Sequence, residues 1–217
     1  MNTLEVEFNT LKKYTSHQEI EKQLQKIMAV FLNGYHLVVN NKTIEPIEVE
    51  SYYYLKSVFE DEYMHKEDSL QDNHFGHPYF HKMNNVLKTG NYKGMDICLS
   101  NQPGMYFSLL IRSAIIDGKV CYGPSNCLKE IFENDENYKH LYKTEQDKTI
   151  LKTNKIIKSS LNLYYGARYG LSENPNNFSE WRLYKEKKLR MVIGEIYRIS
   201  AVKIKDKRKL LKFEINN

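Results

Sequence analysis

The sequence predicts a single domain of the α/β type, more narrowly α+β, built around a mostly antiparallel sheet. Three observations predict it. An amphipathic helix is expected over residues 16–34, a β-hairpin follows over residues 35–54, and two apolar strands joined by a turn follow over residues 94–116. Strands that follow one another through short turns pair antiparallel, and a single amphipathic helix must bury its apolar stripe against such a sheet.

The helix has clear boundaries. Ser16 and Glu19 have the spacing of a capping box, in which each side chain bonds to the backbone N–H of the other residue. Apolar residues then recur at helical spacing as far as Phe31. Gly34 is expected to end the helix as a C′ glycine.

The hairpin carries the most informative stretch of the chain. Its strands are expected over 35–39 and 43–54, and an Asn-Asn-Lys turn joins them. Because side chains alternate along a strand, the second arm presents an apolar face and a face with carboxylates set between aromatic rings. The two faces are Ile47, Val49, Ser51 and Tyr53 on one side and Glu48, Glu50, Tyr52 and Tyr54 on the other. An alternative is an edge strand whose Glu and Tyr side chains face solvent.

The remaining elements follow in order. Residues 60–91 are irregular and predict a long functional loop. Further segments are expected as strands over 94–100 and 105–116, a helix opening at Gly123–Pro124, a charged helix and loop over 134–158, strands within 189–204 and a last short strand over 210–215.

Composition limits the possibilities. The chain has 217 residues, of which 41% are hydrophobic, so one domain over 1–217 is expected, with a core at about 16–204 and a basic C-terminal strand or tail at 205–217. No segment has the length and hydropathy of a membrane span, and the first residues lack a signal-peptide apolar region. We therefore expect a cytoplasmic protein without a membrane partner, associated with the nucleoid if the source is prokaryotic. Three cysteines without a CxxC pair favour neither a disulfide framework nor a cysteine zinc site.

Charge is unevenly distributed. The net charge is +5, and lysine and arginine concentrate between Arg182 and Lys212, whereas residues 60–72 are acidic. A basic flank beside an acidic and aromatic centre suits a polyanion held by its backbone. A solvated lysine-rich surface accounts for the charge equally well.

Arg112 stands inside the apolar run SLLIRSAII. A buried guanidinium needs a carboxylate or a phosphate as its partner. Glu50 or an incoming phosphate could fill that role, and a purely structural ion pair is an equal alternative.

At this point the residues resemble a known family. A series of short motifs, in the same order, is similar to motifs of the alkyladenine (3-methyladenine) DNA glycosylases. They are Glu48-x-Glu50-x-Tyr52, Glu60–His65, Tyr79–Lys82, Gly94–Cys98, Leu110–Ala114, Gly123–Ser125, Ala167–Gly170 and Lys188–Arg190.

The resemblance implies a single mixed domain with a curved, mostly antiparallel sheet, an open barrel or roll with peripheral helices. It implies a monomer that binds duplex DNA, flips a modified purine out of the helix and hydrolyses its N-glycosidic bond without a metal or cofactor. By position, Glu50 would activate the water, Tyr52 and His65 would stack on the base, and Arg112 would orient the glutamate or a phosphate. His81 joins the expected substrate-binding residues.

The sequence departs from the family pattern at the base-reading positions. The family tyrosine that fills the gap left by the flipped base corresponds to Lys93, with Tyr92 one residue earlier. A pocket asparagine corresponds to Ser100, with Asn101 next to it. These substrate-binding positions are therefore expected to serve a different base, or a different nucleic acid.

Two other functions are compatible with the sequence. One is a catalytically altered or silent nucleic-acid-binding relative of the glycosylases. The other is a metal-dependent hydrolase in which His74, His77 and His81 bind a metal with Asp61 or Glu50, although Gly76 and Pro78 interrupt any helix that would align the histidines.

Overall fold

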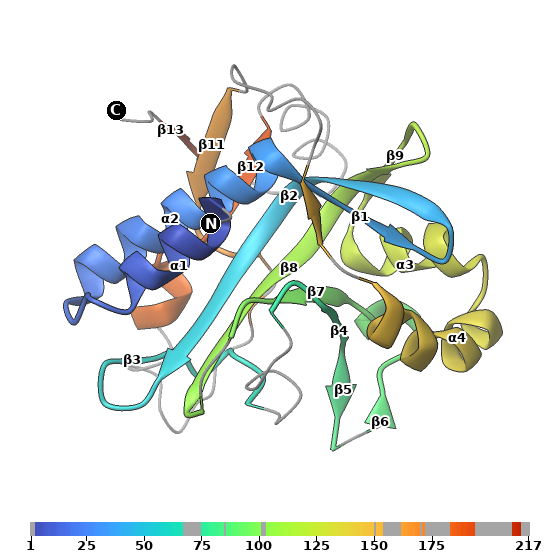
Figure 1. Ribbon diagram of the computed structural model, residues 1–217, viewed down its shortest axis with the longest axis horizontal. Helices are drawn as coiled ribbons and strands as arrows, with labels where there is room; N and C mark the ends of the chain where they lie inside the picture. Colours follow the sequence, from blue (N-terminus) through green and yellow to red (C-terminus); the bar gives the residue numbers. More distant parts are fainter. Residues whose placement is uncertain are drawn as a thin grey trace.

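Strands β2 (Lys42–Leu55) and β8 (Met105–Ile116) are the two long central strands of a large open sheet (Figure 1). The computed structural model describes residues 3–66, 75–84, 86–100, 103–149, 151–153, 162–169, 171, 183–193 and 210–213. Within these residues the main path of the sheet runs β13-β11-β12-β2-β8-β7-β4, and the paired strands are antiparallel. The fold is thus a mixed α+β domain with a mostly antiparallel open sheet, as the sequence predicts.

The other strands of this sheet are short. They are β1 (Tyr35–Val39), β3 (Phe59–Glu60), β4 (Pro78–Phe80), β7 (Met95–Cys98), β9 (Lys119–Tyr122), β10 (Lys152–Thr153), β11 (Leu163–Gly166), β12 (Arg190–Ile193) and β13 (Leu211–Phe213). A separate hairpin is formed by β5 (Lys82–Met83) and β6 (Val86–Leu87). The helices are α1 (Thr3–Leu11), α2 (His17–Gly34), α3 (Pro124–Phe132) and α4 (Asp135–Lys148), with a 3₁₀ turn, η2, at Gly90–Tyr92.

Helix α2 confirms the capping box but not the glycine cap. The backbone N–H of Glu19 donates to Ser16 Oγ, and Ser16 Oγ in turn donates to the Glu19 carboxylate at 2.5 Å. Gly34 is the last helical residue and does not have a positive φ. The chain enters β1 directly through Tyr35, which is extended and whose N–H donates to the carbonyl of Phe31. No left-handed residue is needed because the strand begins at once.

The hairpin of β1 and β2 is confirmed. Asn40 and Asn41 both have positive φ, 49° and 61°, which is the backbone of a type I′ turn. Asparagine tolerates this left-handed conformation better than most residues. Strand β2 lies between β12 and β8 and not at an edge, so the edge-strand alternative is wrong.

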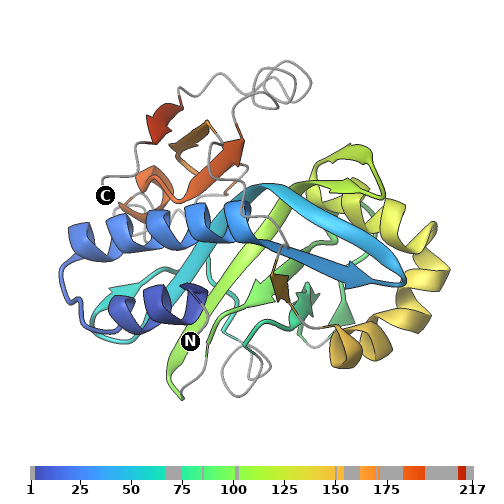
Figure 2. The ribbon, with the colours of Figure 1, turned by 45° about the horizontal axis from the view of Figure 1, so that its top comes forward.

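The apolar face of β2 belongs to the main core. Ile47, Val49 and Tyr53 are each at most 1% exposed and pack in one cluster with side chains from α1, α2 and α3. Helix α2 lies across β2 and β12 (Figures 1 and 2). Helix α1, to which the sequence analysis assigns no element, adds three buried residues to this core: Leu4, Phe8 and Leu11.

A double irregularity lies in the β2–β8 ladder. The pairing shifts by one residue between Pro46 and Glu48 and shifts back between Glu48 and Val49, so Ile47 on β2 and Arg112 on β8 are both left without a ladder partner. The register is therefore the same on both sides of the irregularity. On each strand, however, the buried apolar face changes from one set of alternate residues to the other, so Ile111 and Ala114 both enter the core.

The region expected as one long loop contains short strands. Strand β4 pairs with β7, and the β5–β6 hairpin follows it, whereas residues 67–74 lie outside the described part of the chain. Local composition misses these strands because each has only two or three residues and depends on its partner for its hydrogen bonds. None of the described helices combines the length and hydropathy that a membrane crossing requires.

Candidate active site

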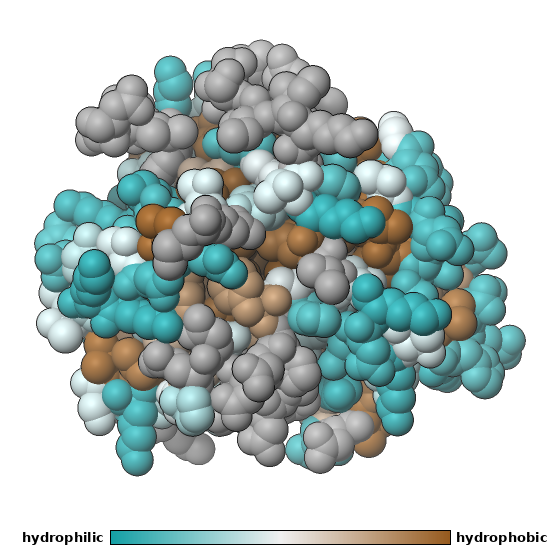
Figure 3. All heavy atoms as spheres, in the orientation of Figure 1, coloured by the Kyte–Doolittle hydropathy of each residue, from teal (hydrophilic) through white to brown (hydrophobic). Residues whose placement is uncertain are grey.

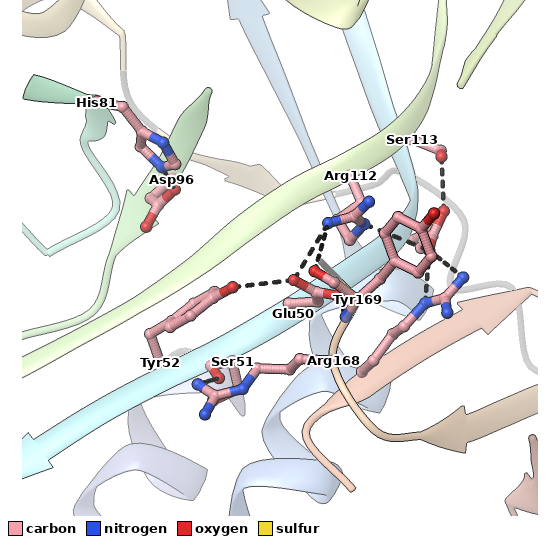
Figure 4. Close-up of polar contacts among 11 residues, drawn as sticks. Glu50, Ser51, Tyr52, His81, Asp96, Arg112, Ser113, Arg168 and Tyr169 are labelled. Carbon is pink, nitrogen blue, oxygen red and sulfur yellow. Dashed lines mark hydrogen bonds and ion pairs between the residues drawn. The ribbon is translucent and has the colours of Figure 1, made fainter. Parts of the chain in front are cut away.

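Glu50 lies at the centre of a polar cluster on the face of β2 opposite the core. It is 0% exposed, and its two oxygens accept hydrogen bonds from different groups. Oε1 accepts from the backbone N–H of Tyr169 at 2.6 Å, and Oε2 accepts from the Tyr52 hydroxyl at 3.0 Å and from Arg112 NH1 at 3.4 Å (Figure 4). The structure thus brings together three residues that the sequence analysis selected: Glu50, Tyr52 and Arg112.

Glu48 is held by the neighbouring strands. Its Oε1 accepts from Arg190 Nε at 2.7 Å and lies 2.6 Å from Arg190 NH2, and its Oε2 accepts from Ser113 Oγ at 2.7 Å. Arg112 Nε lies 3.7 Å from Glu48 Oε1. The irregular pairing of β8 explains the arrangement, because it lets the consecutive side chains of Arg112 and Ser113 both reach the glutamate face.

Arg168 forms the back of the site. Its guanidinium makes two hydrogen bonds to Asp61, at 2.5 and 3.0 Å, and donates to the carbonyl of Ser51 at 3.1 Å. It also lies over the Tyr52 ring, 4.5 Å from the centroid. One face of that ring is therefore covered by Arg168, and the backbone of the same loop supplies the Tyr169 N–H that binds Glu50.

The buried charges of this cluster balance. Three carboxylates face three guanidinium groups, and none of the six side chains is more than 12% exposed. They are Glu48, Glu50, Asp61, Arg112, Arg168 and Arg190. A buried charge is tolerated only when it is paired and hydrogen-bonded, which this network provides. Arg112 is partly exposed, so it is the one member of the six that reaches the surface.

The hydroxyl of Tyr52 is a permanent donor to Glu50. Burial and the Glu50 carboxylate raise the pKa of Tyr52 well above its ordinary value. Glu50 therefore keeps one neutral donor and one cationic donor on the same oxygen. The NH1 atom of Arg112 is also 3.5 Å from the carbonyl of Tyr169. A carboxylate, a guanidinium and a carbonyl meeting at this point are suitable partners for one water molecule.

A second polar group lies on the same face of the sheet. His81 Nε2 is 2.5 Å from Asp96 Oδ1, and Ser108 Oγ donates to Asp96 Oδ2 at 2.6 Å. The ring of His65 is 5.1 Å from that of His81. His65 and His81, both expected in the pocket, are thus neighbours, and they are joined to Tyr52 through a small cluster made of Met64, Tyr79 and Cys98.

Comparison with known proteins identifies a relative of this chain. No protein-family model matches the chain. The chain is 31% identical, over 188 residues, to uncharacterized protein L759 of Acanthamoeba polyphaga mimivirus, and the match covers 75% of this chain and 83% of the relative. The chain belongs to the family of this mimivirus protein. The name of L759 states no activity, so the chemistry of this member of the L759 family follows from its own residues.

The other sequence-predicted residues of this L759-family protein lie in different surroundings. Tyr92, at the end of η2, is 80% exposed. Lys93 is 5% exposed, and its ammonium is paired with Asp135 of α4. Ser100 is 0% exposed, and its hydroxyl accepts from the backbone N–H of Phe107 at 2.6 Å. The side chains of Lys93 and Ser100 are thus buried and bonded to other residues of the protein, whereas Tyr92 faces outward. Asn101 lies outside the described residues.

The metal alternative has no support in the described part of this L759-family chain. No group of three His, Cys, Asp or Glu side chains there is arranged to hold a metal ion. The two carboxylates that this alternative uses are paired with arginines, Asp61 with Arg168 and Glu50 with Arg112. His77 contacts the carbonyl of Gln146, and His74 lies outside the described residues.

Some residues of the site are absent from the sequence-based selection. Asp96 and Arg168 lie within the motifs Gly94–Cys98 and Ala167–Gly170, but the resemblance gives neither of them a role, and the sequence predicts Asp61 only as a metal ligand. The signal that identified Arg112, a charge within an apolar run, also applies to Asp96 in the buried strand β7. For Arg168 and Asp61 no local signal exists, because they are 107 residues apart in the chain.

His65 provides a test of the local electrostatics. Burial, and secondarily the nearby His81, lowers the pKa of His65 from 6.5 to about 4. The unfolded chain therefore binds a proton at a higher pH than the folded chain does. His65 therefore does not lower the free energy of unfolding above about pH 6.5. As the pH drops from 6.5 toward 4, protonation of His65 in the unfolded chain lowers that free energy by at most about 3 kcal/mol.

We expect His65→Gln to flatten this pH dependence. Urea unfolding of both proteins, followed from about pH 7 to about pH 4.5, measures the difference. The carboxylate Asp96 does not interfere in this window, because its pKa is lowered from an ordinary value of 3.8. Parallel curves for the two proteins would show that His65 is not held neutral by its surroundings.

Proposed function

We propose that the protein is a base-excision glycosylase of the alkyladenine DNA glycosylase type. It would take a modified, alkylated purine from duplex DNA and hydrolyse the N-glycosidic bond with a water that Glu50 activates. The observation that carries the proposal is the contact of Glu50 Oε2 with both the Tyr52 hydroxyl and Arg112 NH1. These are the residues to which the resemblance assigns the water-activating, base-stacking and orienting roles.

The chemistry follows from the geometry of that contact. A water held between Glu50, Arg112 and the carbonyl of Tyr169 can give a proton to Glu50 as its oxygen attacks the sugar C1′. The Tyr52 ring is covered on one face by Arg168, which leaves the other face for a base. A cationic alkylpurine stacks favourably on a tyrosine and leaves as a neutral molecule, so neither a metal nor another cofactor takes part.

The proposal is tested by base release. Purified protein is incubated with duplex DNA that carries 3-methyladenine or 7-methylguanine, and free bases are separated by chromatography. We expect release of the alkylated purine and retention of normal bases. If the folded protein releases no base from any alkylated duplex, the hydrolytic function is excluded.

A silent binding protein of the same shape is the second candidate. The observation that favours it is the complete engagement of Glu50, which has no exposed surface and accepts from three donors. In that case an abasic-site mimic in a duplex binds with strong salt dependence while no base is released.

Tyr92 gives a separate prediction about DNA binding. Exposed apolar side chains also occur on the neighbouring β5–β6 hairpin, where Met83 is 64% and Val86 68% exposed, and apolar spheres reach the surface there (Figure 3). A large exposed ring beside such a hairpin can enter the gap left by a flipped nucleotide. We expect Tyr92→Ala to weaken binding to an abasic-site duplex about tenfold or more, because base stacking on an aromatic ring contributes about 1–3 kcal/mol.

Fluorescence anisotropy with labelled duplexes measures this effect. Since Tyr92 is 80% exposed, its removal is expected to leave the unfolding midpoint unchanged. Val120→Ala, which shortens an apolar side chain that is 40% exposed on β9, is the control and should bind normally. Equal binding by wild type and Tyr92→Ala would remove Tyr92 from the interface.

A further inference from the structure

A strip of aromatic side chains continues past Tyr52 toward the end of β2. Residues two apart on a strand share a face, so Tyr54 lies on the same face as Tyr52. Tyr106 of β8 is directly opposite Tyr54 in the strand register, and the two rings meet edge to face with their centroids 6.0 Å apart. All three rings are half-buried and pack on one small buried cluster. They therefore form a continuous aromatic surface beside the candidate active site.

The cross-strand pair on the other face of the same strands is packed differently. Tyr53 and Phe107 are 1% and 0% exposed and belong to the main core. Tyr54 and Tyr106, in contrast, keep part of their surface in contact with solvent. A half-buried tyrosine offers an apolar ring and a polar hydroxyl together, and such residues are enriched where proteins bind a partner.

Lysine side chains lie over this aromatic surface. Lys66 Nζ is 4.5 Å from the centroid of the Tyr54 ring, and Lys82 Nζ is 5.9 Å from that of Tyr79 in the buried cluster. Lys66 is 37% exposed, and its ammonium is 3.2 Å from Glu62 Oε2. Aromatic rings with lysines above them combine a stacking surface with positive charge for a phosphate backbone. Proteins that bind single-stranded nucleic acid use this combination.

A nucleobase can replace Lys66 on the Tyr54 ring. A cation–π contact at an exposed site contributes about 0.5–1 kcal/mol, whereas a base stacked on an aromatic ring contributes about 1–3 kcal/mol. The exchange therefore favours the base. Because the lysine side chain is long and flexible, its ammonium can then pair with the phosphate of the bound nucleotide.

The spacing of the rings sets a condition on the nucleic acid. A strand rises about 3.3 Å per residue, so the Cα atoms of Tyr52 and Tyr54 are about 6.6 Å apart. Stacked bases in a duplex follow one another at about 3.4 Å. Two neighbouring bases therefore reach Tyr52 and Tyr54 only when they are unstacked from each other. An unpaired strand can be stretched in this way, whereas the neighbour of a flipped base in a duplex stays paired and stacked.

We propose that Tyr54, Tyr106 and Lys66 form a second nucleotide-binding site, which holds the nucleotide next to the one stacked on Tyr52. The inference rests on the proposed function, which places the target base on Tyr52, and it names the substrate class. That class is DNA with two neighbouring unpaired nucleotides, as in a single strand. The two tyrosines supply the stacking surface and Lys66 supplies the charge for the phosphate.

The test compares two labelled DNAs by fluorescence anisotropy at one salt concentration. One is a duplex with a single abasic-site mimic, and the other is the strand with the mimic alone. We expect Tyr54→Leu and Tyr106→Leu each to weaken binding to the single strand about tenfold or more, and binding to the duplex less than about threefold. Tyr54→Phe keeps the ring and should bind both DNAs like wild type. Tyr122→Leu, which removes a half-buried ring on β9, is the matched control and should change neither affinity.

Lys66→Met supplies a measurement that does not depend on the packing of the rings, because Lys66 is exposed. Loss of one phosphate contact is expected to reduce the slope of log affinity against log salt concentration on the single strand by about 0.7. Lys119→Met also breaks an exposed ion pair, and it should keep the slope of the wild type.

The second site and the glycosylase function can fail separately. Tyrosine variants that weaken binding to both DNAs equally or to neither, or an unchanged salt slope in Lys66→Met, would overturn the second site. Release of alkylated bases by the wild type would then still support the glycosylase function. Wild-type protein that releases no base, but whose single-strand binding depends on Tyr54, Tyr106 and Lys66, would overturn the glycosylase function and support the second site.

Discussion

Glu50→Gln is expected to lower the rate of base release by at least about 10³-fold while the protein stays folded. General-base catalysis contributes about 10² to 10⁴, and this carboxylate also stabilises the positive charge that develops on the sugar. Glutamine keeps the size of the side chain and can still accept from the N–H of Tyr169. It cannot take a proton from water, and so hydrolysis should fail at the chemical step.

The measurement is single-turnover release of 7-methylguanine, corrected for the folded fraction by circular dichroism. Glu48→Gln is the matched control, because Glu48 is a neighbouring buried glutamate that contacts Arg190 and Ser113 and does not contact Tyr52. Glu48→Gln should lower the stability of the fold to a similar extent, but it should lower the rate of base release much less than Glu50→Gln does. Equal release by wild type and Glu50→Gln would exclude Glu50 as the base.

Arg168→Met is expected to have the largest effect on stability, a loss of about 3–5 kcal/mol. Asp61 is 0% exposed and would be left as a buried carboxylate without its bidentate partner. The substitution also removes the group that covers the Tyr52 ring. Urea unfolding monitored by fluorescence and circular dichroism measures the change.

Two further variants separate charge from packing. Arg168→Met combined with Asp61→Leu removes both charges and should recover part of the lost stability, because no unpaired ion remains. Lys119→Met breaks an exposed pair with Glu130 and should leave the unfolding midpoint unchanged. If Arg168→Met costs no more than Lys119→Met, the buried pair does not stabilise the fold.

Local patterns were sufficient for much of the fold. The capping box at Ser16, the Asn40-Asn41 turn and the alternation along β2 each depend on residues close together in the chain, and each is present in the structure. Helix α1 was missed although Leu4, Phe8 and Leu11 have helical spacing, because such a short stretch is stable only when packed against α2. The short strands between β3 and β7 were missed for the same kind of reason.

The site was only partly accessible from sequence. Glu50, Tyr52 and Arg112 come together because β2 and β8 pair directly, and a charge in an apolar strand signals that such a partner exists. The position of the loop that holds Arg168 and Tyr169 could not be predicted from sequence, because Tyr169 and Glu50 are 119 residues apart in the chain. The burial of Lys93 was likewise unforeseen, because it depends on Asp135 in a distant helix.

The paired irregularity in the central ladder has a consequence for how such a chain can change in length. Loss of Ile47 alone, or of Arg112 alone, would remove a residue that has no ladder partner, so the cross-strand pairs of β2 and β8 could stay as they are. Loss of both together would keep the strands in step but remove the guanidinium beside the two glutamates. A deletion of Arg112 is therefore expected to spare the strand pairing and to remove the chemistry of the site.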